Sequence, residues 1–93
     1  GNFTRMPKPV PGMQISGAWR NAEAMPLAVT ISVSAQGIQL VAAGRTLALK
    51  LLSDGIYQSE NGAYVLGFGA SDTGEPELIL FHEGLGAERL LRF

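Results

Sequence analysis

The 93-residue chain contains no cysteine and only one histidine. Without cysteine it can form no disulfide, offer no thiolate to a metal and use no cysteine nucleophile. One histidine is too few for a multi-histidine metal site within one chain. No serine lies in a G-x-S-x-G motif, which would mark a nucleophile of the hydrolase type. We therefore predict a protein that is not an enzyme and that holds no metal and no cofactor.

Charge is also scarce. Charged residues make up 16% of the chain, and seven basic residues against eight acidic ones leave a net charge of −1. Nucleic-acid binding needs a basic face, so we predict no nucleic-acid partner. No apolar run reaches the roughly 18 residues of a membrane-spanning helix, so we predict no transmembrane segment. Asp72, Glu75 and Glu77 cluster in sequence as calcium ligands would, but we expect a solvated loop there.

Hydrophobic residues are plentiful, at 46% of the chain, which suffices for the core of one small domain. They alternate with small or polar residues, as in Leu27, Val29 and Ile31, and period two indicates strands rather than helices. The expected strands cover residues 15–20, 27–34, 38–42, 46–51, 56–60, 63–69, 77–82 and 87–93. We predict an all-β protein, an antiparallel up-and-down meander barrel of about eight short strands.

Glycine-containing turns separate these strands. Gly44-Arg45 suits a two-residue type II′ hairpin, and Asn61-Gly62 is a strong type I′ signal. Gly67 and Gly69 lie inside an expected strand, where a glycine often marks a β-bulge that shifts the register. Closure of the meander would remove its exposed edges.

The first 13 residues differ from the rest, because they hold three of the five prolines. Proline favours extended backbone, so we predict an extended N-terminal arm over residues 1–13 and a single barrel domain over residues 14–93. The chain begins with Gly1 rather than methionine, and from this we expect a processed N-terminus. Together with the arm, this suggests export to the periplasm or secretion, including export as a lipoprotein.

The first expected strand contains Gly17-Ala18-Trp19, and the last contains Arg89 and Arg92. This G-x-W pattern with a late arginine resembles the lipocalin or calycin family. The resemblance implies that Trp19 packs across one end of the barrel with an arginine against it, while Gly17 permits close approach. A guanidinium over an indole contributes about 0.5–2 kcal/mol. It also implies a non-enzymatic barrel that binds an apolar ligand or a protein partner.

A second resemblance is to small exported bacterial protease-inhibitor barrels. These also carry a G-x-W near the start, and their N-terminal arm enters the protease cleft. This resemblance implies an alternative function, the inhibition of a protease or another hydrolase through the arm.

Strand parity divides the apolar residues between the two faces of the sheet. The interior of an eight-stranded barrel is either filled by side chains or holds one small ligand, and the sequence leaves both open. The alternation assigns these residues to the interior: Leu27, Val29, Ile31, Val33, Ile38, Leu40, Leu47, Leu49, Leu51, Ile56, Tyr64, Leu66, Phe68, Leu78, Leu80 and Leu90. We take as candidate ligand-lining residues Leu49, Tyr64, Leu66, Phe68, Leu80 and His82.

The remaining apolar residues fall on the outer face by parity. They are Val41, Leu52, Val65, Ile79, Phe81 and Leu91. A contiguous exposed apolar face marks a partner surface, so we predict a homodimer or a protein partner on these strand faces.

Overall fold

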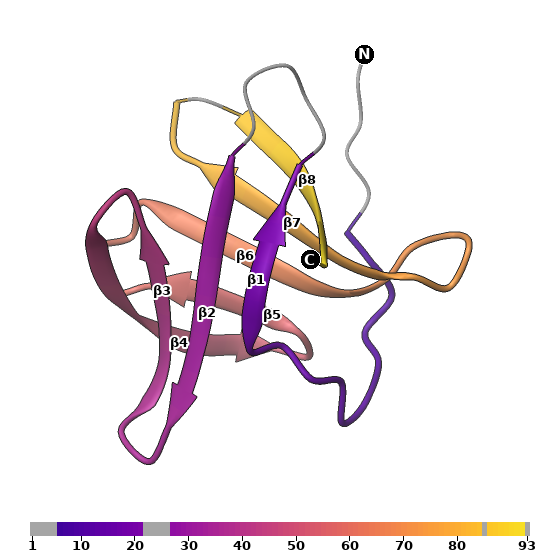
Figure 1. Ribbon diagram of the computed structural model, residues 1–93, viewed down its shortest axis with the longest axis horizontal. Helices are drawn as coiled ribbons and strands as arrows, with labels where there is room; N and C mark the ends of the chain where they lie inside the picture. Colours follow the sequence, from indigo (N-terminus) through magenta and orange to yellow (C-terminus); the bar gives the residue numbers. More distant parts are fainter. Residues whose placement is uncertain (1–5, 22–26, 85, 93) are drawn as a thin grey trace.

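The computed structural model describes residues 6–21, 27–84 and 86–92. They form eight antiparallel strands that close into a barrel in chain order (Figure 1). The strands are β1 (Gly17–Arg20), β2 (Ala28–Ser34), β3 (Gly37–Ala42), β4 (Arg45–Ser53), β5 (Ile56–Ser59), β6 (Tyr64–Ala70), β7 (Pro76–His82) and β8 (Gly86–Arg92). The predicted all-β up-and-down barrel is confirmed. Among the described residues there is no helix long and apolar enough to cross a membrane.

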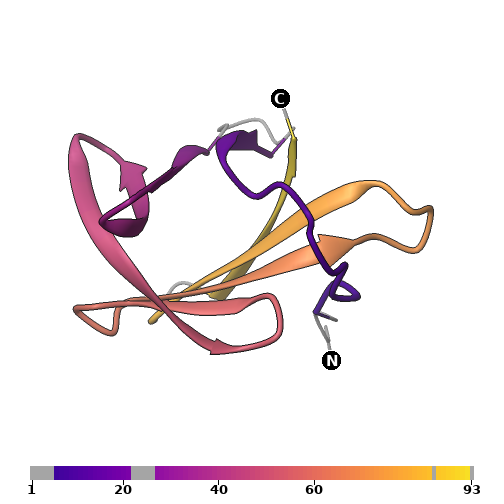
Figure 2. The same ribbon diagram turned by 90° about the horizontal axis from the view of Figure 1, so that it is seen from below.

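The up-and-down order gives the barrel two distinct ends. Odd-numbered strands finish, and even-numbered strands begin, at the end that we call the mouth, where Asn21 and His82 lie. The opposite end, which we call the far end, carries the β2–β3, β4–β5 and β6–β7 turns. Seen from below, the strands surround a common interior while the N-terminal arm crosses outside β6 and β7 (Figure 2).

The centre of the barrel is filled with side chains from alternate strand positions, as the period-two pattern predicts. Phe68 makes edge-to-face contacts with Trp19 and with Tyr57, each with ring centroids 5.7 Å apart. The buried cluster consists of Trp19, Val29, Ile31, Leu40, Leu66, Phe68, Leu78, Leu80 and Leu90. Burial of these large apolar groups is the main favourable term in the folding of so small a chain.

Two residues assigned to the interior are instead exposed, Val33 at 53% and Leu51 at 61%. Both lie at the far end, where a neighbouring strand has already stopped. The β1–β2 pairing ends at Gly17 and Ile31, and the β3–β4 pairing ends at Ile38 and Leu49. A side chain that points inward is therefore not buried when it lies beyond the last paired residue of the neighbouring strand.

The β-bulge lies elsewhere than expected. The β6–β7 register runs without a shift through Gly67 and Gly69, and the irregularity falls between Leu51 and Ser53 of β4. Tyr57 pairs with Leu51 before the shift and packs against the core, whereas Ile56, which was assigned to the interior, pairs with Gly67 of the other face. The expected bulge at the β6 glycines is wrong.

Two turns also differ from expectation. The β3–β4 loop is Ala43-Gly44, closed by the pair Ala42 and Arg45, and both loop residues have positive φ (52° and 75°) as a type I′ turn requires. Type II′ at Gly44-Arg45 is therefore wrong. At Asn61-Gly62 only the glycine has positive φ, so type I′ does not form there either. The Asn61 side chain instead accepts a hydrogen bond from the Ala63 amide at 3.0 Å.

The glycines of β6 serve the N-terminal arm. Lys8 and Ala70 exchange two backbone hydrogen bonds, of 3.1 and 2.9 Å, which anchor the arm to the end of β6. A Cβ at Gly67 would stand 2.5 Å from the Cε atom of Met6, and one at Gly69 would overlap the Lys8 carbonyl oxygen. Glycine at both positions therefore lets the arm lie flat on the sheet. Residues 1–5 of the predicted arm lie outside the described residues.

The arm also changes the outer surface. Ile79 was assigned to the exposed outer face but is 2% exposed, and it does not belong to the core cluster. It pairs with Gly67, over which Met6 lies, so it is next to the part of the sheet that the arm covers. Of the six predicted outer apolar residues only Leu52 is strongly exposed, at 50%. The outer apolar surface is therefore smaller than parity alone predicts.

This geometry predicts that Gly69→Ala destabilises the protein by displacing the arm. The backbone of Gly69 lacks a positive φ, so the cost comes from overlap with the backbone of Pro7 and Lys8 in the arm. We expect a loss of about 1–3 kcal/mol in the free energy of unfolding, measured in urea.

Deletion of residues 1–9 provides the control. Without the arm, Gly69→Ala should change the free energy of unfolding by less than about 0.5 kcal/mol. An equal loss with and without the arm would show that the overlap does not involve Lys8.

Candidate functional site

Trp19 and Arg92 meet inside the barrel. The indole is fully buried, and its Nε1 donates to the Ile15 carbonyl at 3.0 Å. The Arg92 guanidinium lies 5.0 Å from the centroid of the indole ring. It also donates to the Gln14 carbonyl at 2.9 Å and to the Ser16 carbonyl. Arg92 thus ties the segment before β1 to the last strand.

Gly17 completes this contact. Its φ is +118°, and a Cβ at this position would stand 3.3 Å from Nη2 of Arg92. A side chain here would therefore be strained and would press on the guanidinium. Three of the four residues taken for barrel-end packing, Gly17, Trp19 and Arg92, come together in the structure.

The fourth residue, Arg89, lies on the outer face and forms an ion pair with Glu77. Residues three apart on a regular strand point to opposite faces, so Arg89 and Arg92 cannot both face the indole. The Glu77 side chain is 10% exposed against 55% for Arg89, so the arginine supplies the charge partner of a nearly buried carboxylate.

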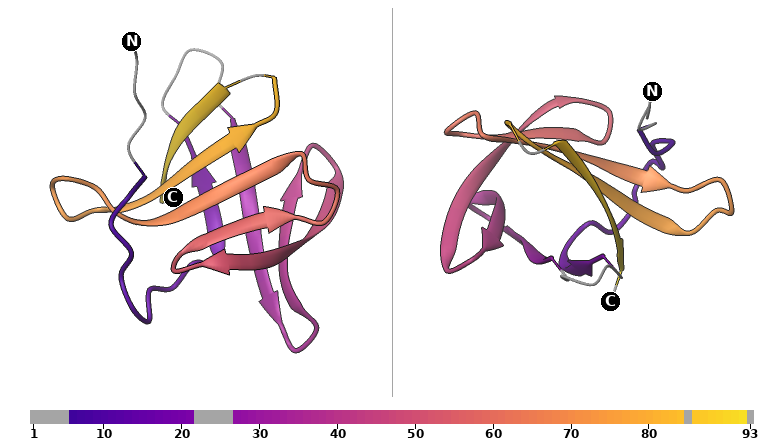
Figure 3. Two further views of the ribbon diagram at one scale, coloured as in Figure 1. Left: turned by 180° about the vertical axis from the view of Figure 1, so that it is seen from behind. Right: turned by 90° about the horizontal axis from the view of Figure 1, so that it is seen from above.

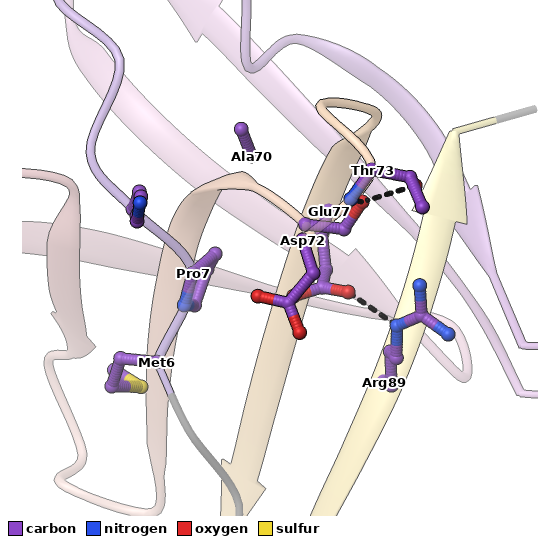
Figure 4. A pocket seen from close by; sticks show the side chains of 9 residues that line it. Met6, Pro7, Ala70, Asp72, Thr73, Glu77 and Arg89 are labelled. Carbon is purple, nitrogen blue, oxygen red and sulfur yellow. Dashed lines mark hydrogen bonds and ion pairs between the residues drawn. The ribbon is translucent and has the colours of Figure 1, made fainter.

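A polar pocket of about 420 Å³ adjoins this ion pair, between the arm and the β6–β7 loop. Figure 4 shows Met6 and Pro7 on one side of it and Asp72, Glu77 and Arg89 on the other. The Glu77 and Arg89 charges already satisfy each other, and Asp72 also takes part in an interaction. We regard this pocket as the space left between the barrel and the arm where the arm docks.

The far end carries a second hollow, of about 310 Å³, between the arm and the β4–β5 turn. Val10 and Leu51 border it, and both are substantially exposed. Tyr57 and Phe68 form part of its lining, so the filled core lies directly behind it. The arm passes around this end before it enters β1 (Figure 3).

The mouth holds a more enclosed cavity, of about 270 Å³. All of its described lining residues come from the mouth ends of strands or from the turns beside them. Its apolar wall is formed by Leu27, Val29, Leu40, Ala42 and Leu80. Its polar groups are Asn21, Tyr64, His82 and Glu88. An apolar cavity with a few fixed polar groups is the usual form of a small-molecule site.

Fixed contacts hold the polar groups of the mouth. Tyr64 and His82 are register partners on β6 and β7, and their rings stack with centroids 4.5 Å apart and planes inclined by 12°. The Asn21 side chain, which is buried, donates to the Glu88 carboxylate at 3.2 Å and accepts from the Leu27 amide at 2.8 Å. The amide of Asn21 therefore orients the carboxylate at the rim.

The predicted lining residues divide between two regions. Tyr64, Leu80 and His82 line the mouth cavity. Leu66 and Phe68 are buried in the filled centre, and Leu49 packs against it. The interior is thus filled at its centre and hollow at its mouth.

Asn21 and Glu88 were missed as site residues. The signal was strand parity, because Asn21 continues the inward side of Trp19 and Glu88 shares the parity of Leu90. Polar side chains on the inward side near a strand end are candidates for the rim of a barrel.

Comparison with protein-family models, curated protein sequences and solved structures gives no significant match. The structure itself shows a closed eight-stranded barrel. The resemblance of the chain to lipocalins therefore has no support beyond the geometry of its own residues.

The Trp19–Arg92 contact predicts a specific loss of stability. Arg92→Met should lower the free energy of unfolding by about 1–3 kcal/mol, because it removes the cation–π contact and two charged hydrogen bonds to carbonyls. Urea unfolding followed by the fluorescence of Trp19, the only tryptophan, measures the change.

Arg45→Met is the matched control. Arg45 is exposed at the start of β4, so its replacement should change stability by less than about 0.5 kcal/mol. Equal effects of the two substitutions would contradict the role given to Arg92.

Proposed function

We propose that this protein is a non-enzymatic, lipocalin-like barrel that binds a small, largely apolar molecule in the cavity at its mouth. The observation that carries the proposal is the 270 Å³ cavity itself, which has an apolar wall and a polar rim. Small-molecule sites usually occupy about 300–1,000 Å³. The mouth therefore suits a ligand near the lower limit, of the size of one substituted ring.

The arrangement of the rest of the chain supports this proposal. The centre of the barrel is already packed, so a ligand would enter without a rearrangement of the core. Trp19 under Arg92, with Gly17 beside them, is the packing that a lipocalin-like barrel is expected to show. With the centre packed, the mouth is the more enclosed of the hollows at the two ends of the barrel.

The lining of the mouth also favours binding over catalysis. Its described residues include His82 and Glu88 but no serine, threonine or lysine that these groups would activate. His82 stacks on Tyr64, and Glu88 accepts from Asn21. These groups therefore act as ligand contacts in our proposal.

The inhibitor alternative has less support. Insertion of the arm into an enzyme cleft would require Lys8 to leave Ala70 and Met6 to leave Gly67. Those contacts hold the described part of the arm against its own barrel. The mouth cavity needs no such release.

Ala42→Phe tests the proposal. Ala42 lines the mouth, and a phenyl ring there would occupy the space of the ligand. The probe is 2-phenylethanol, whose binding to the native protein we expect in the range of about 1 mM for so few atoms. Backbone amide shifts in a two-dimensional NMR titration should give saturable binding that Ala42→Phe weakens at least about tenfold.

Ala48→Phe is the control, because Ala48 is exposed on β4 and does not line the mouth. It should bind the probe as the native protein does. Native affinity in the Ala42→Phe variant, or no binding to the native protein, would contradict the proposed site.

A further inference from the structure

We propose that the ligand of the mouth is a small apolar amine, bound as its cation. This inference deepens the proposed function and rests on it. The mouth offers one carboxylate, two stacked aromatic rings and an apolar wall, and its described lining includes no lysine or arginine. Each of these features favours a positively charged head group on an apolar body.

Glu88 is the group that would receive the ammonium. It is the only acidic residue in the described lining, and the Asn21 amide fixes one of its oxygens, Oε2, at 3.2 Å. A carboxylate has about four acceptor sites, so the single bond from Asn21 leaves capacity for a further donor. Asn21 is itself held by the Leu27 amide, which keeps the carboxylate in a defined position.

The aromatic pair adds a second attraction. Tyr64 and His82 stack with planes 12° apart, and both rings line the cavity. The face of a tyrosine ring attracts a cation through its quadrupole. A protonated amine in the mouth would therefore have the Glu88 carboxylate and this aromatic pair within one cavity lining.

The apolar wall deep in the cavity is the part that would contact the apolar body of the ligand. Leu40 and Leu80 belong to the buried cluster and also line the cavity, so the wall of the mouth is the upper surface of the core. A hydrocarbon group that covers them removes apolar area from water, whereas a second charge there would be left without a partner. Anionic ligands are disfavoured, since they would place a negative charge near Glu88.

Three probes of one size separate these contributions in the full chain. They are 2-phenylethylamine (a cation), 2-phenylethanol (neutral) and phenylacetate (an anion). We expect the amine to bind about fivefold more tightly than the alcohol, as a partly exposed ion pair would give. Phenylacetate should bind most weakly.

Glu88→Gln keeps the shape of the side chain and removes its charge. In this variant the amine and the alcohol should bind within about twofold of each other, and the affinity for the alcohol should be unchanged. The matched control is Glu83→Gln, which removes one negative charge from the β7–β8 turn outside the mouth cavity. It should retain the preference for the amine.

The outcomes distinguish the inference from the proposed function. Equal binding of amine and alcohol to the native protein would overturn the amine inference and leave the mouth as a binding site. A preference that Glu83→Gln abolishes as fully as Glu88→Gln would also overturn it, because net charge alone would then be responsible. Failure of every probe to bind would overturn the proposed function itself.

Discussion

The contact between Arg92 and Trp19 joins the first and last strands where the barrel closes. The seam between β1 and β8 is short, with Trp19 opposite Arg92 and Arg20 opposite Leu91. Arg92 reinforces it from the inside, through the indole face and through the carbonyls of Gln14 and Ser16. Because the mouth is built from both sides of this seam, the cavity exists only while the seam is closed.

The same packing divides the interior. Trp19, Phe68 and Tyr57 stack edge to face and occupy the space between the sheet walls, so the centre holds no room for a ligand. Toward the mouth the inward side chains become smaller or polar, as at Ala42 and Asn21, and the cavity opens. The arm covers the outer face at Gly67, and of the hollows at the two barrel ends the mouth is the more enclosed.

Strand parity was sufficient to predict the barrel, its strand order and most of its core, because period two fixes which face each residue occupies. Strand parity predicted the wrong exposure for side chains whose burial depends on residues far away in the sequence. Val33 and Leu51 point inward past the end of a neighbouring strand, and Ile79 pairs with Gly67, which the N-terminal arm covers. The role of Gly67 and Gly69 was missed for the same reason, since only the path of the arm explains them. Asn21 and Glu88 carried a local signal in their parity, but their pairing joins residues 67 positions apart.

The most direct test of the account is an isotope-filtered NOE spectrum of the native protein with 2-phenylethanol. We expect contacts from the phenyl ring to the methyl groups of Val29, Leu40 and Leu80 at the mouth. Contacts to Val33 or Leu51 at the far end, without contacts to these three residues, would contradict it.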